Sequence, residues 1–289
     1  MLTIKCCLWF NQTAKNAVNF YKNTFGDLEI EHTEYYTKAG SEIHQQSEGT
    51  VMTISFKLWN QDFIALNGNS MFKHSPSFSN FVYVKSTADL DKIWNQLTVD
   101  GTIRMPLNEY PWSKKYGWVA DQYGVEWQLM LSEGENKIVP AILFVDSLYG
   151  KGQQALDFYL KSFPVSKLIA KEITDEHILF SQFKLYNQEF ILMEGAGAHG
   201  HVFSESYSIV LNCETQAEID QFWTQLTMNG GQKGPCGWLK DSFGISWQVV
   251  PKDLSLWLKE APQNKKEKLL AKLMDMEKLN IAELKLILD

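Results

Sequence analysis

Two halves of the chain carry the same sequence pattern, and this repeat constrains the fold more than any other feature. The segment YGWVADQYGVEWQLML at 116–131 is matched by CGWLKDSFGISWQVVP at 236–251, with Gly, Trp, Asp, Gly, Trp and Gln at the same spacing. Three more blocks recur in the same order: AVNFYKNTF with ALDFYLKSF, FKLWNQDFIALNG with FKLYNQEFILMEG, and DLDKIWNQLTVDG with EIDQFWTQLTMNG. Because four blocks match in the same order in both halves, the chain contains a duplication, and such self-similarity marks repeated structural units.

Within each repeat, the hydrophobic period alternates between that of strands and that of helices. Apolar residues between 14 and 25 recur at helical spacing, and short apolar or alternating runs flank them. The order then restarts with a strand, a helix near 88–98 and further strands, with turn residues between them. We therefore predict an α+β fold in which βαβββ occurs twice in each repeat. Unequal offsets between the matched blocks place two longer loops in the first repeat, within 31–50 and within 103–116.

Changes in composition mark the domain boundaries. A polar stretch at 132–137 separates the repeats, so we predict one domain at 1–135 and a second at 136–252. From 253 to 289 the pattern becomes that of amphipathic helices, with Asn280 as a candidate N-cap. This tail packs its apolar stripe either on one of the domains or on a partner subunit.

Charge and cysteine usage exclude several classes of partner. The chain has 289 residues, a net charge of −7 and one arginine, Arg104, whereas nucleic-acid binding needs a basic footprint. The four cysteines follow neither a disulfide nor a zinc spacing, which favours reduced thiols. The first residues lack a signal-peptide pattern, and no apolar run approaches the roughly 18 residues of a membrane helix. We expect a cytoplasmic protein that binds neither nucleic acid nor membrane.

The repeated motifs resemble those of the PhnB-like branch of the vicinal oxygen chelate superfamily, which includes glyoxalase I, extradiol dioxygenases and bleomycin-resistance proteins. The resemblance rests on AxxFYxxxF, FIALNG, the helix EIDQFW and CGWLKDSFGISWQVVP, and it extends to LMDMEKLNIAELK in the tail. It implies tandem glyoxalase/bleomycin-resistance-like domains, in which two βαβββ units form a cupped mixed sheet open to a ligand. The domains would pair as a pseudo-dimer within the chain, and a homodimer remains open. Proteins of this branch often carry a 3-demethylubiquinone-9 3-methyltransferase label.

Metal-dependent members of the superfamily hold a divalent ion with His and Glu on four strands. The resemblance maps these ligands onto other residue types here: Gln128 and Gln248, Cys6, Asn67 and Glu194, and Ser79 or Ser208. Neutral amides are weak ligands for nickel or zinc, which prefer imidazole, carboxylate or thiolate donors. We therefore do not predict a specific cofactor. A divalent metal stays open, with Glu194 and Gln248 as the weak candidate ligands.

Alternation along the last strand of each repeat predicts which side chains face the cup. Trp127 belongs to the apolar set, which suits packing beneath a helix, so Gln128 belongs to the set that faces the cup. The same argument applies to Gln248. With Asn67 and Glu194 on the strand after the hairpin, these residues form the predicted ligand-binding set.

Several other motifs favour structural roles. The stretch GAGAHG at 195–200 fits a nucleotide or S-adenosylmethionine loop only if a helix follows, and a strand pattern follows instead. Asp121 and Asp241 lie in D-x-x-G, which is typical of a tight turn. Trp118 and Trp238 either wall an aromatic pocket or pack in the core.

Two functions are compatible with the sequence. The first is a module that binds a small, partly apolar molecule in the cup, with amides for orientation and aromatic rings for burial. The alternative is a divalent-metal-dependent enzyme of isomerase, lyase or dioxygenase type, acting on a substrate with vicinal oxygens. A third interpretation is that one repeat has lost its site, and the first repeat is then the candidate.

Overall fold

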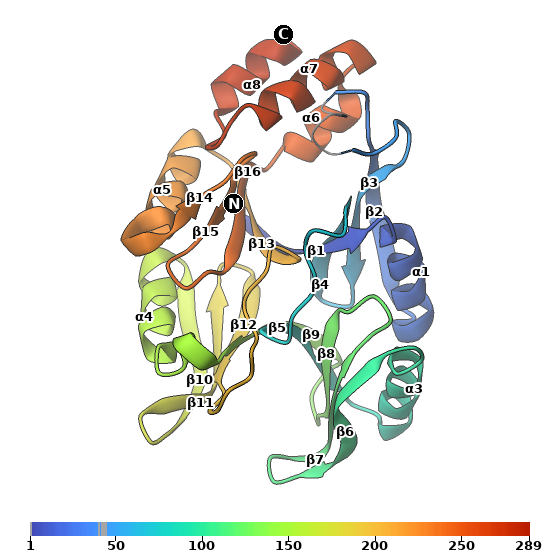
Figure 1. Ribbon diagram of the computed structural model, residues 1–289, viewed down its shortest axis with the longest axis vertical. Coiled ribbons are helices and arrows are strands. Elements are labelled where there is room, and N and C mark those ends of the chain that lie inside the picture. The colour runs from blue at the N-terminus through green and yellow to red at the C-terminus, as the bar shows by residue number, and fades with distance from the viewer. Residues whose placement is uncertain (1, 40, 42–44) are drawn as a thin grey trace.

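The computed structural model describes residues 2–39, 41 and 45–289 (Figure 1). Four βαβββ units follow one another, as the repeats predict. Unit 1 consists of β1 (Thr3–Asn11), α1 (Ala14–Phe25), β2 (Leu28–Tyr35), β3 (Val51–Leu58) and β4 (Gln61–Gly68). Unit 2 consists of β5 (Phe78–Val84), α3 (Thr87–Leu97), β6 (Thr102–Tyr110), β7 (Ser113–Ala120) and β8 (Glu126–Leu131).

The second repeat has the same element order. Unit 3 consists of β9 (Lys137–Phe144), the short helix η1 (Asp146–Leu148), α4 (Gly152–Ser162), β10 (Ser166–Thr174), β11 (His177–Leu185) and β12 (Gln188–Glu194). Unit 4 consists of β13 (Tyr207–Cys213), α5 (Gln216–Thr227), η2 (Met228–Gly230), β14 (Gln232–Lys233), β15 (Trp238–Lys240) and β16 (Ser246–Pro251). No described helix is long and apolar enough to cross a membrane.

Each of the two eight-stranded sheets takes one unit from each repeat. Sheet A has the order β14-β15-β16-β13-β1-β4-β3-β2, and sheet B has the order β10-β11-β12-β9-β5-β8-β7-β6. Units 1 and 4 therefore form sheet A, joined by the antiparallel pair β1–β13, and units 2 and 3 form sheet B, joined by β5–β9. The boundary between 135 and 136 stays a prediction, and each sheet contains residues from both sides of it.

Reciprocal hydrogen bonds mark the pseudo-twofold relation between the repeats. The Gln61 and Gln188 side chains, in the two matched hairpins, donate to each other at 2.9 and 2.8 Å. Beside them, Asn60 pairs with the backbone N–H and C=O of Ile138, and Asn187 accepts from the backbone at the equivalent place in β1. These amides link the two sheets, and the buried pair Gln61 and Gln188 satisfies the hydrogen-bonding groups of both side chains.

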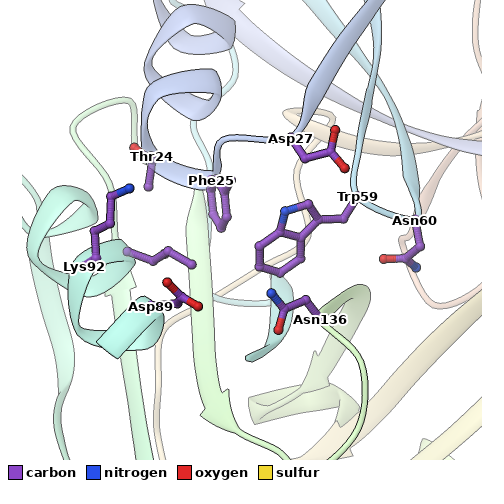
Figure 2. A pocket seen from close by; sticks show the side chains of 9 residues that line it. Thr24, Phe25, Asp27, Trp59, Asn60, Asp89, Lys92 and Asn136 are labelled. Atoms are coloured by element: carbon purple, nitrogen blue, oxygen red, sulfur yellow. The ribbon is translucent and has the colours of Figure 1, made fainter. Parts of the chain in front are cut away.

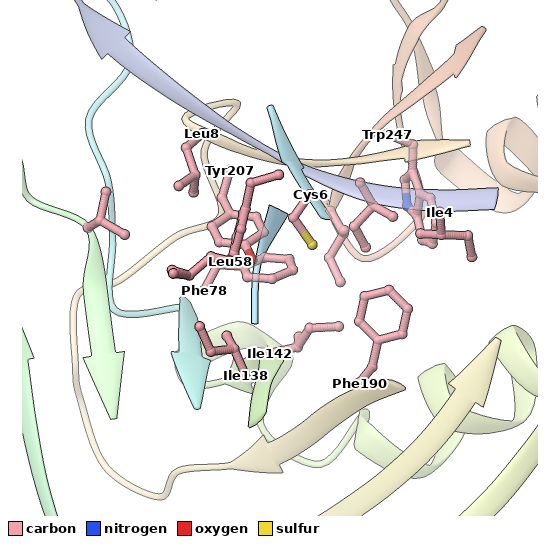
Figure 3. Packing of buried hydrophobic residues seen from close by; sticks show 14 of the residues in the cluster. Ile4, Cys6, Leu8, Leu58, Phe78, Ile138, Ile142, Phe190, Tyr207 and Trp247 are labelled. Carbon is pink, nitrogen blue, oxygen red and sulfur yellow. The ribbon is translucent and has the colours of Figure 1, made fainter. Parts of the chain in front are cut away.

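One continuous hydrophobic core lies between the sheets. Ile4, Cys6 and Leu8 of β1 point toward Ile138 and the neighbouring apolar side chains of sheet B (Figure 3). The helices α1 and α3 cover one flank of this core, and α4 and α5 cover the other (Figure 1). The faces opposite the core, here called cup A and cup B after their sheets, therefore point away from each other.

The alternation predicted for the last strands is confirmed. Trp127 and Trp247 are 0% and 1% exposed and lie beneath α1 and α4, with ring centroids 5.2 Å from Tyr21 and 5.9 Å from Tyr159. Replacing so large a buried side chain by alanine typically costs about 3–5 kcal/mol of stability. Their neighbours in sequence consequently face the cups.

The tail forms three helices, α6 (Leu254–Glu260), α7 (Gln263–Met274) and α8 (Ile281–Leu288), which lie at the cup A end of the molecule (Figure 1). The predicted N-cap is confirmed, because the Asn280 side chain accepts from the backbone of Glu283. Of the two packing alternatives, the tail packs within the chain, where its leucines contact Met52 and Val250 of sheet A. Hydrogen bonds of 2.6 Å and 2.7 Å from the turn at 236–237 to the backbone at 276–277 fix this position.

Candidate binding site in cup A

Cup A holds a chamber of about 590 Å³ between sheet A and the tail, here called the inner chamber. Its floor contains polar side chains from four strands: Cys7, Thr53, Ser55, Asn212 and Gln248. The apolar side chains Ile64, Leu66 and Val210 lie among them. Its roof is apolar and comes from α6 and α7: Leu254, Leu258, Leu270, Leu273 and Met274. A chamber of this size, apolar on the helix side and with hydrogen-bonding groups among the apolar residues of the sheet side, is suited to a small amphipathic ligand.

Uncharged groups surround Gln248 on the floor of the inner chamber. The Gln248 amide, half-buried, donates to the Ser208 hydroxyl at 2.9 Å. Beside them, burial raises the pKa of the Cys7 thiol to about 12, against hydrogen bonds to Gln248 and Ser208 that lower it. The thiol is therefore protonated at neutral pH, which makes it a poor nucleophile.

Charged side chains at one side of the inner chamber tie the tail to the sheet. Glu34 of β2 is only 4% exposed. One of its carboxylate oxygens pairs with the Lys266 ammonium of α7, and the other lies 3.1 Å from Nε2 of His32. A buried carboxylate needs such partners, since desolvation without them is costly. This contact joins the roof to the floor.

A second space in cup A, here called the outer chamber, measures about 480 Å³. Tyr36 and Trp238 line both chambers, so the two are neighbours on one face of sheet A. The Trp9 indole is held by a 2.8 Å hydrogen bond to a backbone carbonyl and by the edge of Phe72 at 5.0 Å. Gly68 lies directly beneath this indole, where a Cβ atom would collide with the ring.

Cup B is filled by the protein's own side chains. Buried residues gather on it in a separate hydrophobic cluster: Phe81, Tyr83, Tyr116, Val139, Ala141 and Ile191. Gln128, at 2% exposure, accepts from the Tyr116 hydroxyl at 2.6 Å and donates to the Ser79 hydroxyl at 2.8 Å. Gln128 thus faces the cup as predicted, but its amide is already engaged inside the protein.

A buried carboxylate completes the filling of cup B. Glu126 is 1% exposed and accepts from Arg104 at 2.8 Å and from the Trp118 indole N–H at 2.9 Å. Burial raises the pKa of Glu126, and the Arg104 guanidinium and the indole oppose that rise. The single arginine of the chain therefore binds a carboxylate of the protein itself.

The orientation predicted for Asn67 and Glu194 is wrong. Asn67 accepts from the backbone N–H of Ala14 at 2.8 Å, and Glu194 accepts from the backbone of Gly150 and Gly152 at 2.6 and 3.0 Å. Both side chains therefore lie on the core face and hold the segments that begin α1 and α4. The sequence offered a signal against the prediction, because Asn67 lies four residues after the buried Phe63 and shares its face of the strand.

A further pocket of about 510 Å³ lies where α1 meets α3 (Figure 2). The rings of Phe25 and Trp59 meet edge to face there at 5.5 Å. Its charged groups, Asp27, Asp89 and Lys92, are exposed, so they keep their water and contribute little to specificity. Cup A, with its half-buried amide and aromatic walls, is the stronger candidate site.

A family model described as 3-demethylubiquinone-9 3-methyltransferase matches residues 3–130 and 136–250, once for each repeat. The chain belongs to this family. Among solved structures, a putative 3-demethylubiquinone-9 3-methyltransferase, PhnB protein, from Bacillus cereus is 36% identical over 44% of this chain and 98% of its own, with a TM-score of 0.40. No match is found among curated proteins.

Two longer structures share the tandem fold of this PhnB-like chain. Glyoxalase I from Zea mays is 12% identical over 90% of this chain and 95% of its own, with a TM-score of 0.58. A putative dioxygenase from Bacillus subtilis is 10% identical over 99% of this chain and 95% of its own, with a TM-score of 0.53. Both likenesses confirm the predicted glyoxalase-like fold, and they concern the fold alone.

The donor set of cup A does not fit a divalent metal, although metal binding is common in the superfamily. Cys6 points into the core, and it is Cys7 that faces the cup, with a thiol that stays protonated. The remaining central positions offer an amide and a hydroxyl, Gln248 and Ser208, and Glu194 lies on the other face of its sheet. Across residues 2–39, 41 and 45–289, no three His, Cys, Asp or Glu side chains gather as metal ligands would.

The glycine-rich stretch of this PhnB-like chain is a loop, as its sequence context predicted. Asp146 holds the loop by accepting from the backbone of His199 and His201, and β13 follows without an intervening helix. The turn role of Asp121 and Asp241 is also confirmed, because each accepts two backbone N–H groups of its own turn. None of these segments contributes to cup A.

Proposed function

We propose that this PhnB-like protein binds a small, partly apolar molecule in cup A. The observation that carries the proposal is the difference between the two cups. Cup A holds two adjoining chambers of about 590 and 480 Å³, whereas cup B is occupied by a buried aromatic cluster. The two sheets descend from one ancestral arrangement, so the open one supports a binding role and the filled one a structural role.

The lining of the inner chamber indicates how such a molecule would be held. Its apolar part would pack against the leucines of α6 and α7, where each buried methylene contributes about 0.8 kcal/mol. An uncharged hydrogen-bonding group would meet the Gln248 amide and Asn212 on the floor. Of the charged side chains in the lining, Glu34 and Lys252 are engaged in ion pairs with Lys266 and Glu214. Lys5 is likewise paired with Glu31 at 2.9 Å.

The chain's chemistry favours binding over the metal-dependent alternative. A Lewis-acid reaction on vicinal oxygens needs a site of anionic or imidazole donors, and the centre of cup A presents an amide, a hydroxyl and a protonated thiol. The family description names a methyltransferase, and a loop that binds a methyl donor would need a helix directly after it. The glycine-rich loop at 195–200 leads into a strand instead, so it does not support methyl transfer.

Filling the inner chamber tests the proposal. Met274 lines the roof of the chamber and is half-buried, so Met274→Trp places a larger ring in the ligand's space. The matched control is Leu256→Trp, on an exposed position of α6. With Nile red as a neutral apolar probe, we expect Met274→Trp to weaken binding at least tenfold and the control to leave it unchanged. Equal affinities in the wild type and both variants would contradict the proposal.

A further inference from the structure

The two cups differ at one position in a way that indicates what the outer chamber binds. The matched blocks align Trp118 with Trp238 and Glu126 with Ser246. The strand registers agree, since Trp118 pairs across the sheet with Gln128 as Trp238 pairs with Gln248. Ser246 therefore has the same diagonal relation to Trp238 that Glu126 has to Trp118.

In cup B this position supplies an internal acceptor. The Glu126 carboxylate receives the indole N–H of Trp118 at 2.9 Å and the guanidinium of Arg104 at 2.8 Å. In cup A the carboxylate is missing, because serine replaces it. The Ser246 hydroxyl is buried at 1% exposure and has no hydrogen-bond partner among the described residues. An unsatisfied buried hydroxyl costs roughly 1–3 kcal/mol, which a ligand acceptor would recover.

The space left by the missing carboxylate is the outer chamber, and its charge favours an anion. Ser246 and Trp238 both line it. Its charged lining residues are Lys233, Lys240 and Glu205, two cations and one anion, and hence a net charge of +1. Lys240 is paired with Glu205 at 2.9 Å, whereas Lys233 is exposed. One negative charge on a ligand would balance this set.

The walls of the outer chamber favour a planar ring. Trp9 and Trp238 come from different strands, Phe72 from the loop after β4, and Tyr36 from the loop that begins directly after β2. Aromatic rings stack or meet edge to face with a gain of about 0.5–1.5 kcal/mol beyond the area they bury. The hydrogen bond from the Trp9 indole to the backbone of Asn69 fixes this wall before any ligand arrives.

We propose that the outer chamber binds a planar aromatic carboxylate, whose carboxylate takes the place that Glu126 occupies in cup B. It accepts from the indole N–H of Trp238 and from the hydroxyl of Ser246, and its ring lies against Trp9. The inference rests on the proposed function, because it assumes that cup A is the binding face, and it adds the charge and shape of the ligand.

The test uses 2-naphthoate as the probe and 2-naphthamide as its neutral counterpart, with the full chain. Calorimetry should show that the wild type binds 2-naphthoate at least tenfold more tightly than 2-naphthamide, and the indole N–H resonance of Trp238 should shift on titration. Ser246→Glu restores the internal acceptor and should abolish binding of 2-naphthoate. Asn95→Glu places the same charge on an exposed position of α3, away from cup A, and should retain it.

Two milder variants keep the inference falsifiable if Ser246→Glu does not fold. Ser246→Ala and Trp238→Phe each remove one donor, and each should reduce the preference for 2-naphthoate over 2-naphthamide several-fold. Equal binding of both probes by the wild type, or an unchanged preference in both variants, would overturn the inference. Nile red reports separately on the inner chamber, so its retention in that case would leave the proposed function standing.

Discussion

At the scale of single residues, one aspartate in each repeat joins a turn, a strand and a helix. One oxygen of Asp241 accepts two backbone N–H groups of its turn, and the other accepts from the Tyr159 hydroxyl at 2.8 Å and the Trp247 indole at 2.8 Å. Asp121 makes the matching set with Tyr21 and its own tryptophan. The D-x-x-G spacing predicted the turn, but not the contact with a helix about 80 or 100 residues away in sequence, because tertiary packing decides it.

Removing either carboxylate should therefore destabilise the fold. Asp241→Ala leaves the buried indole N–H of Trp247 without an acceptor, and each such loss costs about 1–3 kcal/mol. We expect the free energy of unfolding in urea to fall by at least about 2 kcal/mol, and Asp121→Ala to behave alike. The exposed Asp157→Ala serves as control, and losses no greater than the control's would contradict this role.

The same aspartates should titrate far from their usual range. Burial raises the pKa of Asp121 and of Asp241 from 3.8 to about 6, against four hydrogen bonds each that lower it. Since the folded pKa is the higher one, the folded protein retains protons that the unfolded chain releases. This contribution to stability is present below about pH 4 and is lost as the pH rises through 6. Carboxyl ¹³C shifts check it, and midpoints near 4 would refute it.

At the scale of elements, the tail and the strand register decide what the cups can hold. The amphipathic pattern after Pro251 predicted helices, yet it did not predict that α6 and α7 roof a chamber, since many surfaces accept an apolar stripe. Period two correctly placed Gln128 and Gln248 opposite their tryptophans. The same rule, applied from Phe63 and Phe190, would have placed Asn67 and Glu194 on the core face.

The ion pair between roof and floor should control how fast a ligand leaves the inner chamber. Lys266→Met leaves the buried Glu34 carboxylate without its ammonium partner, which weakens the contact of α7 with β2. We expect Nile red to dissociate several-fold faster in stopped-flow experiments. Lys268→Met, on an exposed position of the same helix, is the control. Identical dissociation rates in the two variants would show that this contact does not hold the roof.

At the scale of the whole molecule, each sheet is shared between the repeats. The sequence shows four equivalent units but not which two pair, because every unit presents the same first strand to a partner. The connection between β8 and β9 at 132–136 is short, and β9 pairs with β5. The pair β1–β13 joins strands that lie far apart in the sequence. Consequently the open cup and the filled cup do not correspond to one repeat each, because cup A and cup B both combine residues of the two repeats.

Cutting the chain between the repeats tests this arrangement. With a protease site inserted at 132–136, the two halves should stay together after cleavage, because the β1–β13 and β5–β9 ladders cross from one half to the other. Size-exclusion chromatography under native conditions should show one species of unchanged size. Separation into two folded halves would mean that each repeat forms a sheet of its own.

A crystal structure of the full chain with 2-naphthoate tests most directly whether cup A is the binding face. We expect the naphthalene ring on sheet A beside Trp9, with the carboxylate between Trp238 and Ser246. Naphthoate found only on cup B, or only in the pocket between α1 and α3, would contradict it.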